Sequence, residues 1–348
     1  MSTANEAPIF SSTGSLGVSR RQDERLYANA TRFSTDPSEV IRNFGRLAAT
    51  LDRQPERIGR VVFRGLVSAD VLDEILASDL CNDLEVVLPV HEFGQTGSLA
   101  YMARNRRERT AIVPIDDMIY ETTEYPSKTM RPLERVQSAL QQGYAFTSRL
   151  HAEDIHQVHS LWGPTFGWSV DEVANLARRL EAESQLSPEA RSDWLIMVKN
   201  GKEVVSIAMA ERLSIPASEG RLEMIENTEW CTSSDYGGRG LMTAALTLLN
   251  TQILNDMDGN TPLIFAECNF QSRSDRAGYG AGFRIPERTP AGYPAPQVLV
   301  QNVGVNDRQP VEVGKLRDFT FMYLPRTIIQ QVYSPEQTAR VIETAQIG

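Results

Sequence analysis

The hydrophobic positions change their period several times along the chain, and each change predicts a new helix or strand. In the first third, apolar residues spaced three or four apart predict helices over 38–51 and 71–76. Continuous runs rich in Val, Leu and Phe predict strands over 60–65 and 84–90. This alternation indicates a small α/β domain, in which we recognise no catalytic motif.

Two helices are predicted early in the second half of the chain. Ile155, Val158 and Trp162 have the spacing of one helix face. The next helix begins at Ser169, which forms a capping box with Glu172 because each side chain can satisfy a free backbone N–H of the first turn.

The strongest local signal is a β-hairpin. Two β-rich runs, 194–198 and 204–210, flank Asn200-Gly201. This dipeptide favours a tight turn in which both central residues adopt positive φ. We therefore predict the turn at these two residues.

The elements after the hairpin alternate between strand and helix. A strand at 221–232 runs into a glycine-rich turn, and a helix starts at 241. The apolar runs beyond it predict a strand at 263–268, a short helix at 272–279, strands at 297–303 and 319–324, and a surface helix from 334.

A proline-interrupted stretch, 122–143, separates these two halves and indicates a joint. We divide the chain into a flexible N-terminus at 1–27, an N-terminal α/β domain at 28–125, a linker at 126–143, a second domain at 144–330 and a C-terminal tail helix at 331–348.

The charge balance limits the ligands that the chain can bind broadly. Lys and Arg number 35 and Asp and Glu 45, so the formal charge of the 348 residues is −10. Nucleic acid binding over a wide face is disfavoured, because it depends on basic residues neutralising phosphates. An anion must be held by a local site. The basic run Arg104, Arg106, Arg107 and Arg109 is either a solvated face or a local anion or RNA contact.

Cysteine usage and hydropathy predict the compartment. The three cysteines, Cys81, Cys231 and Cys268, cannot form a disulfide framework in so long a chain, and none has metal-ligand spacing. No apolar window is long enough to cross a membrane, and the N-terminus lacks the apolar core of a secretory signal. We expect a cytoplasmic protein without a membrane contact or a metal site; His156 and His159 lack a third ligand.

The glycine-rich turn is the most informative motif. Gly237-Gly238-Arg239-Gly240 follows a strand and opens a helix, so backbone N–H groups and the helix N-terminus can hold a phosphate. The spacing matches neither a Walker A loop nor a dinucleotide-binding fingerprint. Taken alone, this turn is compatible with a phosphate site or with a plain tight connection.

In its context, the run 236–242 resembles the acyl-CoA loop of the Gcn5-related N-acetyltransferase (GNAT) superfamily. The resemblance extends over roughly 144–324 and includes Ala281-Gly282-Phe283. It departs at Gly237, where the family usually has Arg or Gln, and at Met242, where it commonly has a third glycine. The resemblance implies an α/β (α+β) fold with a mixed, mostly antiparallel sheet flanked by helices, one splayed strand, and acetyl-CoA or another acyl-CoA as co-substrate.

Within the superfamily the chain looks most like the bacterial and archaeal beta-lysine N-acetyltransferases. The run 226–236 followed by Gly240-Leu241-Met242 resembles their strand and loop. Phe93-Gly94, Tyr101-Met102 and Arg107 are similar to residues of their additional N-terminal domain.

The resemblance and the chemistry together suggest catalytic residues. Glu226 and Glu229 lie three apart, so regular pairing would point them to opposite faces, and only one should face the acceptor. Of the two we favour Glu229 as a direct or water-mediated base; a carboxylate on a solvated strand face is the equal alternative. Tyr279 is the candidate acid for the departing thiolate, although it stands three residues before Gly282, where the family commonly has four; a packed tyrosine is the other interpretation.

The resemblance also implies which residues contact the ligands. An opened strand leaves backbone groups free to pair with an amide-bearing cofactor. Trp162, Phe166 and Trp168 are assigned to the acceptor pocket or, equally, to a hydrophobic cluster. The cofactor-binding candidates are Trp230, Cys231, Thr232, Gly237, Gly238, Arg239, Gly240, Leu241, Met242, Thr243 and Asn269.

Three functions are compatible with these observations. The first is an N-acyltransferase that moves an acetyl or related acyl group from acyl-CoA to the amine of a small molecule or amino acid. The second is aminoacyl transfer from a charged tRNA to a small-molecule amine, suggested by Gly237 and by the run 104–109. The third is a non-catalytic binding protein with the same fold. A homodimer is allowed by all three.

Overall fold

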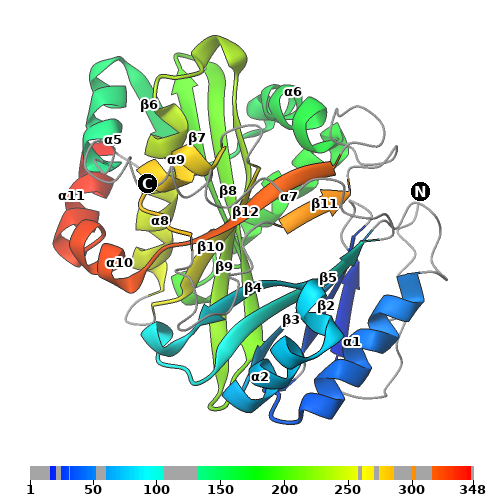
Figure 1. Cartoon of the computed structure of the whole chain (residues 1–348). Helices are drawn as coiled ribbons and strands as arrows, with labels where there is room; N and C mark the ends of the chain where they lie inside the picture. Colours follow the sequence, from blue (N-terminus) through cyan, green and yellow to red (C-terminus); the bar gives the residue numbers. More distant parts are fainter. Residues whose placement is uncertain are drawn as a thin grey trace.

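Two β-sheets and their flanking helices form the molecule (Figure 1). The computed structural model describes residues 16–20, 25–30, 32–51, 60–105, 132–257, 261–269, 274–285, 299–302 and 316–345. Both sheets are mixed: each contains one parallel pair of strands, and the other neighbours are antiparallel. The predicted α/β (α+β) class with a mostly antiparallel sheet is confirmed.

The first sheet has the strand order β1-β2-β3-β5-β4. Helices α1 (Pro37–Leu51) and α2 (Ala69–Ala77) cover one of its faces, and Phe44, Val71 and Ile75 are buried there. The strands are β1 (Leu16–Arg20), β2 (Arg25–Ala30), β3 (Arg60–Val67), β4 (Leu84–Pro89) and β5 (Ser98–Asn105).

The N-terminal boundary is corrected by this sheet. The sequence predicts a flexible lead-in as far as residue 27, but β1 and the first half of β2 lie within that range. Within 28–30 of β2, Ala28 and Ala30 are buried and face the helices of this sheet. Alanine is a weak strand former, so this segment lacks the β-branched run that identifies the other strands.

The second sheet has the order β11-β12-β10-β9-β8-β7-β6, in which only β9 and β10 are parallel. Its strands agree with the predicted positions to within a few residues. They are β6 (Tyr144–Thr147), β7 (Asp193–Asn200), β8 (Glu203–Pro216), β9 (Arg221–Thr232), β10 (Leu263–Asn269), β11 (Leu299–Asn302) and β12 (Leu316–Tyr323).

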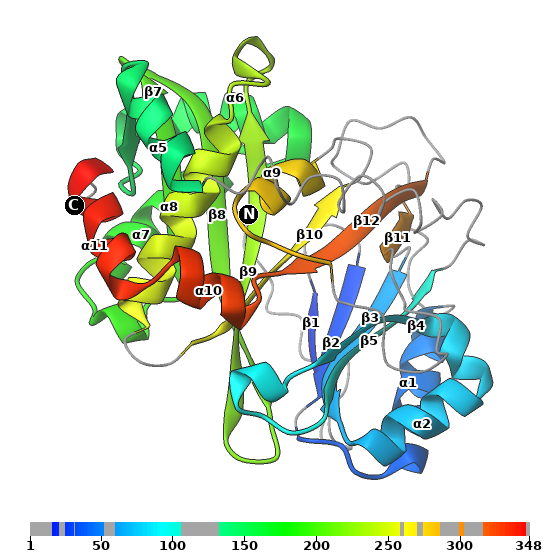
Figure 2. The same cartoon turned by 60° about the vertical axis from the view of Figure 1, so that its left-hand side comes forward.

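Helices cover both faces of this second sheet (Figure 2). One face packs against α5, α8, α9, α10 and α11, and part of the other packs against α6 and α7. Their bounds are α5 (Pro132–Gln141), α6 (Ile155–Phe166), α7 (Val170–Glu183), α8 (Leu241–Asp256), α9 (Ser274–Gly280), α10 (Arg326–Val332) and α11 (Pro335–Ala345).

Helix α5 corrects the predicted linker. The prolines within 126–143 predict a connection, yet Pro132 is the first residue of α5. Proline is well tolerated there, because the first helical N–H has no partner within the helix. Val136 and Ala139 are buried against α8, so this helix belongs to the body of the second sheet.

Two local predictions are confirmed with one adjustment. The capping box at Ser169 and Glu172 is present at the start of α7. The hairpin of β7 and β8 is also present, but Asn200 pairs with Glu203 and the turn residues are Gly201 and Lys202. Gly201 has φ 60° at the first central position, as in a type II′ turn, so the turn lies one residue later than predicted.

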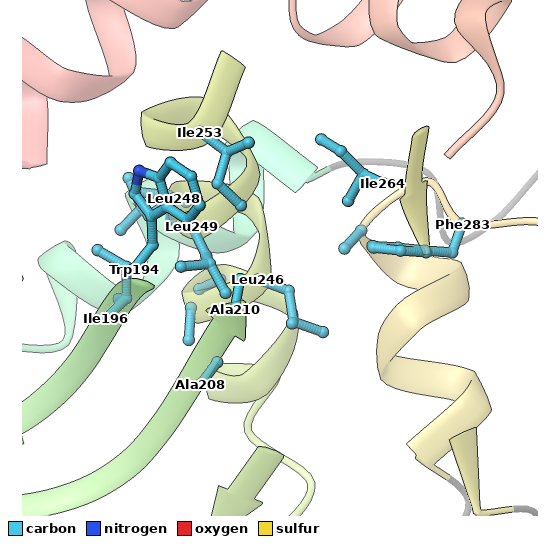
Figure 3. Packing of buried hydrophobic residues seen from close by; sticks show 14 of the residues in the cluster. Trp194, Ile196, Ala208, Ala210, Leu246, Leu248, Leu249, Ile253, Ile264 and Phe283 are labelled. Carbon is cyan, nitrogen blue, oxygen red and sulfur yellow. The ribbon is translucent and has the colours of Figure 1, made fainter. Parts of the chain in front are cut away.

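The largest core lies between the second sheet and α8. Figure 3 shows side chains of β7 and β8 facing those of α8. Twelve of the 16 residues of α8 are buried, which explains why its apolar positions are not confined to one stripe. The facing residues are Trp194, Ile196, Ala208 and Ala210 from the sheet and Leu246, Leu248, Leu249 and Ile253 from α8.

The two sheets also share a core. Helices α6 and α7 cover only part of their face of the second sheet. On the rest of that face, Phe265 and Phe321 are stacked with ring centroids 5.2 Å apart. Tyr101 of β5 packs edge-on against both rings, at 6.3 and 5.3 Å. Val62 and Leu99 belong to the same buried cluster, so the first sheet serves as a third covering layer for the second.

Candidate functional site

Strands β9 and β10 are paired over only part of their length. Their parallel register joins Met224 to Leu263 and ends where Glu226 meets Phe265. Beyond that point β9 continues to Thr232 and β10 continues to Asn269, while β10 stays paired with β12. The two strand ends therefore separate inside the sheet. A strand edge exposed in this way can pair with an extended, amide-bearing ligand.

A β-bulge lies where the strands separate. The register of β8 with β9 passes from Met209–Thr228 to Ile207–Cys231, so β9 contains one residue more than β8 across this step. Glu229 has φ 48°, and within the described part of the chain no other non-glycine residue has a positive φ. A bulge bends its strand and increases the local twist, which directs β9 away from β10.

The bulge is held from the side of α6. Trp162 is fully buried, and its indole Nε1 donates a hydrogen bond of 3.0 Å to the carbonyl oxygen of Glu229. The Cys231 thiol lies 3.5 Å from the carbonyl oxygen of Leu161 and 3.5 Å from the Thr165 hydroxyl. Burial raises the pKa of this thiol, so Cys231 stays a neutral packing residue.

The glycine-rich loop follows the end of β9. Residues Ser234–Tyr236 form a single 3₁₀ turn, after which Gly238 and Gly240 adopt φ 75° and 74°. Gly240 caps α8, and the first helical bond runs from the Ala244 N–H to the Gly240 carbonyl. The backbone N–H groups of residues 238–243 donate to no acceptor among the described residues. Six successive donors are thus available at the helix N-terminus.

Contacts with Tyr144 and Tyr236 hold the glycine-rich loop in place. The Arg239 guanidinium donates to the Tyr144 hydroxyl at 2.8 Å and lies over the ring of Tyr236 at 5.0 Å. The Tyr236 hydroxyl in turn donates to a Glu203 carboxylate oxygen at 2.8 Å. These contacts hold the loop in one shape while leaving Gly237 and Gly238 exposed.

An additional arginine lies beside the loop. The side chain of Arg135, from α5, is so close to Gly240 that a Cβ placed there would be 3.1 Å from its Cδ and 3.4 Å from one guanidinium nitrogen. Arg135 is exposed, and we find no hydrogen bond or ion pair to it from the part of the chain that the structure describes. The sequence interpretation misses this residue because it falls in the predicted linker. The spacing of Leu133, Val136 and Leu140 is the signal that could have found it.

The other cofactor-binding candidates lie in the first turn of α8 and at the end of β10. Met242 packs against the core beside α8, and Leu241 and Thr243 are buried. Asn269 is the last residue of β10, where it pairs with Phe319.

The acceptor-pocket candidates lie beside α6. Phe166 and Trp168 pack against the cluster around Trp162, with the Trp168 and Trp162 rings 4.9 Å apart.

Helix α9 closes the corner opposite β9. A Cβ on Gly278 would lie 3.3 Å from the Trp230 ring, and one on Gly280 would lie 3.0 Å from the Thr243 side chain. The helix therefore contacts both the bulged strand and the start of α8. Tyr279 of α9 is buried, and the Arg284 guanidinium lies 4.0 Å from its ring centroid.

The ionisation of Tyr279 follows from these neighbours. Burial raises the pKa of the phenol above its ordinary value, and the nearby positive charge of Arg284 opposes part of that rise. Tyr279 is thus protonated throughout the neutral range and can serve as a proton donor.

Glu226 lies at the contact between the two sheets. It is 4 % exposed, and its carboxylate lies 3.7 Å from the Arg64 guanidinium of β3. The bulge also removes the regular pairing on which the opposite-face prediction depends. The structure thus places Glu226 at the contact between the two sheets, and its catalytic role stays a prediction that we do not develop.

The remaining candidate features lie elsewhere. Arg104 is paired with Asp83, and its neighbours Arg106, Arg107 and Arg109 lie outside the described residues. No group of three or more His, Cys, Asp or Glu side chains able to hold a metal occurs in the described ranges. None of the helices in those ranges is long and apolar enough to span a membrane.

Comparison with known proteins gives structural neighbours only. No family model matches the sequence, and no curated protein matches it. A putative GNAT-family acetyltransferase from Desulfovibrio desulfuricans is similar over 52 % of this chain and 98 % of its own, with 17 % identity and a TM-score of 0.33.

Two further neighbours are solved with a cofactor. The PaiA N-acetyltransferase from Thermoplasma acidophilum, in complex with coenzyme A, is 12 % identical over 52 % of this chain and 98 % of its own, with a TM-score of 0.30. AAC(6′)-Ib, in complex with ribostamycin and coenzyme A, is 17 % identical over 55 % of this chain and 99 % of its own, with a TM-score of 0.31. At these values the neighbours say nothing about activity.

Proposed function

We propose that this chain is a GNAT-type N-acyltransferase that transfers an acetyl or related acyl group from acyl-CoA to a small-molecule amine. One observation carries the proposal: six successive backbone N–H groups, at 238–243, are available beside a strand that has separated from its neighbour. A diphosphate fits the first feature, and an amide-bearing arm fits the second. Coenzyme A contains both parts in one molecule.

The loop compensates for the acidic charge of the chain. Backbone donors and the positive end of α8 attract an anion without a local excess of basic side chains. Gly237 has no side chain to contact a phosphate, whereas the Arg135 guanidinium lies beside Gly240 and adds a positive charge to the loop. We propose that Arg135 contacts a phosphate of the cofactor.

The reaction requires few groups. The amine nitrogen of the acceptor attacks the thioester carbon, and the carbon–sulfur bond then breaks to give an amide and the CoA thiolate. We propose that Glu229 accepts the proton of the amine, directly or through water, and that Tyr279 donates a proton to the thiolate. Much of the rate enhancement would come from holding the two reactants together.

The acceptor class is proposed from the sequence resemblance. The similarity of 226–236 to beta-lysine N-acetyltransferases favours an amino acid or related metabolite with a free amine. Phe166 and Trp168, which are only partly buried, would line its pocket.

Calorimetry with acetyl-CoA and a thiol-release assay test this function. We expect saturable heat with acetyl-CoA, much weaker heat with pantetheine, which lacks the diphosphate, and thiol release with at least one member of an amine panel. Folded protein that gives no heat with acetyl-CoA at millimolar concentration would refute the proposal. Binding without turnover of any amine would instead favour the non-catalytic alternative.

A further inference from the structure

Trp230 has a buried polar atom for which the described residues supply no hydrogen-bond partner. It follows Glu229 in the bulge of β9, and its indole Nε1 is inaccessible to solvent without donating a hydrogen bond within the described structure. The two fully buried tryptophans are different. Trp162 donates to the Glu229 carbonyl at 3.0 Å, and Trp194 donates to an Asp256 carboxylate oxygen at 2.9 Å.

The contacts of the ring indicate where this N–H lies. The outer edge of the six-membered ring, Cη2 and Cζ3, is the part nearest Gly278 of α9. The ring also packs edge-on against Phe283, with centroids 6.0 Å apart. Nε1 is on the five-membered ring and is therefore not part of the edge that contacts α9. Trp230 itself lies in the segment of β9 that follows the last pair with β10, Glu226–Phe265.

A buried donor without an acceptor is costly to the fold. Leaving such a group unsatisfied forfeits the hydrogen bond that it makes to water in the unfolded chain, and buried indole N–H groups usually find a partner. A phenylalanine at this position would fill a similar space without that cost. An unsatisfied donor at the opening between two strands is therefore a reason to look for an acceptor on a ligand.

We propose that the indole N–H of Trp230 donates a hydrogen bond to a carbonyl oxygen of the bound acyl-CoA. This inference rests on the proposed function and extends it to a side chain. Acyl-CoA offers two kinds of carbonyl to the opening, the thioester and the amides of the pantetheine arm. Both are neutral acceptors that an indole N–H can reach only when the cofactor lies between β9 and β10.

The two carbonyls predict different kinetics. The thioester oxygen gains negative charge as the amine adds, so a donor to it strengthens in the transition state and affects kcat. An amide oxygen keeps its charge, so a donor to it affects the affinity for the cofactor and leaves kcat nearly unchanged.

Indole NMR tests the hydrogen bond directly. The chain has four tryptophans, so ¹⁵N labelling gives four indole signals, and the one lost in Trp230→Phe identifies Trp230. We expect this signal to shift downfield in its proton dimension when acetyl-CoA saturates the protein, while the Trp194 signal stays in place. A shift with both acetyl-CoA and CoA assigns the bond to a pantetheine amide, and a shift with acetyl-CoA alone assigns it to the thioester.

Binding measurements provide the second readout. Trp230→Phe should weaken acetyl-CoA binding about five- to tenfold or lower kcat by a similar factor, consistent with the loss of one hydrogen bond. Trp194→Phe, which also removes a buried indole N–H but lies at the opposite end of the sheet core, should leave both values unchanged.

The outcomes separate this inference from the proposed function. If acetyl-CoA binds by calorimetry but the Trp230 signal does not move, the inference is wrong and the proposed function stands. If acetyl-CoA does not bind to the folded wild-type protein, the proposed function is wrong and this inference falls with it.

Discussion

Glu229 combines an unusual backbone conformation with the chemistry proposed for it. Its φ of 48° costs about 1–3 kcal/mol for a residue other than glycine, and such strain often occurs at functional sites. The bulge that imposes this conformation also turns β9 away from β10. The same residue would therefore open the cofactor groove and present a carboxylate next to it.

Glu229→Gln tests the carboxylate without changing its shape. We expect kcat to fall by about 10²-fold with little change in acetyl-CoA affinity, because general-base assistance is lost while the backbone is kept. Thiol release measured with a saturating amine gives kcat, and calorimetry gives the affinity. Glu219→Gln, in the exposed turn before β9, is the matched control. If the two substitutions change kcat equally, Glu229 is not the general base.

Tyr279→Phe tests the proton donor. Burial raises the pKa of the phenol, with Arg284 opposing part of the rise, so Tyr279 is protonated at neutral and mildly alkaline pH. We expect kcat to fall about 10- to 100-fold in the variant. The ratio of wild-type to variant kcat should stay constant from pH 6 to pH 9, since no proton is lost from the phenol there. A ratio that declines toward pH 9 would contradict this assignment.

The sequence predicts which residue types occur at the site better than it predicts their conformation and contacts. The carboxylate, the tyrosine and the glycines are visible in the sequence as residue types at particular spacings. Three further features are not visible in the sequence: the positive φ of Glu229, the indole N–H of Trp230 that finds no acceptor among the described residues, and the position of Arg135. Each depends on contacts between segments far apart in the chain. The ion pair of Glu226 with Arg64 is another such contact, since it joins the two sheets.

At the scale of elements, the start of α8 depends on Gly240. Its φ of 74° disfavours any other residue, and a Cβ there would press on Arg135. Gly240→Ala should lower the free energy of unfolding by about 1 kcal/mol and also weaken CoA binding, because Arg135 is displaced from the donors of the loop. Urea unfolding and calorimetry measure the two effects.

Gly220→Ala separates strain from binding. Gly220 has φ 71°, but a Cβ at this position would have no neighbour within 4 Å, so the substitution should cost similar stability without affecting CoA. If both variants bind CoA like the wild type, the corner formed by Gly240 and Arg135 is not part of the cofactor site.

Asp193, at the start of β7, should make the stability of the protein depend on pH. Burial raises the pKa of Asp193, the first residue of β7, to about 6, and the Arg179 guanidinium, 3.4 Å away, only partly offsets this. Glu183 and Glu211 add to the rise. The folded state thus holds this proton more tightly than the unfolded state, so the contribution of Asp193 to stability decreases as the pH rises from about 4 to about 6.

Asp193→Asn removes this titration. The difference in unfolding free energy, variant minus wild type, should increase between pH 4 and pH 7 by at most about 3 kcal/mol. Urea denaturation at four pH values in this interval measures it. A difference that does not change with pH would mean that Asp193 has an ordinary pKa in the folded protein.

The elements show where pattern reading succeeds. The start of α7 at its capping box and the turn of the β7–β8 hairpin are located to within a residue, although β8 extends six residues beyond its predicted end. Helix α5 is missed because a proline such as Pro132 indicates a break in regular structure as readily as a first helical residue. The sequence also predicts β9 as one continuous strand, since a bulge changes the pairing and not the composition of a strand.

At the scale of the whole molecule, the two sheets are joined by a shared apolar layer. Tyr101, Phe265 and Phe321 form its centre, and residues of β3, β4 and β5 surround them. Two hydrogen bonds also join the two halves: one links the hydroxyls of Thr96 and Ser218, and the other runs from the Arg326 guanidinium to the Glu92 carbonyl. The two halves separated by the predicted linker therefore share a core in addition to the core that each forms with its own helices. The sequence could not reveal this, because each half contains enough apolar residues to suggest a core of its own.

Phe321→Ala tests whether the shared layer makes unfolding cooperative. Phe321 is 2 % exposed, and its removal should cost about 3–5 kcal/mol through lost burial and the cavity that remains. Because the ring contacts residues of both sheets, we expect amide hydrogen exchange to accelerate together in peptides from β3 and from β8, within one unfolding transition. Leu186→Ala, at an exposed position, should leave both unchanged. Exchange that accelerates in the second sheet alone would mean that the first sheet is stable without the layer, and that it covers β9 and β10 as a separate folding unit.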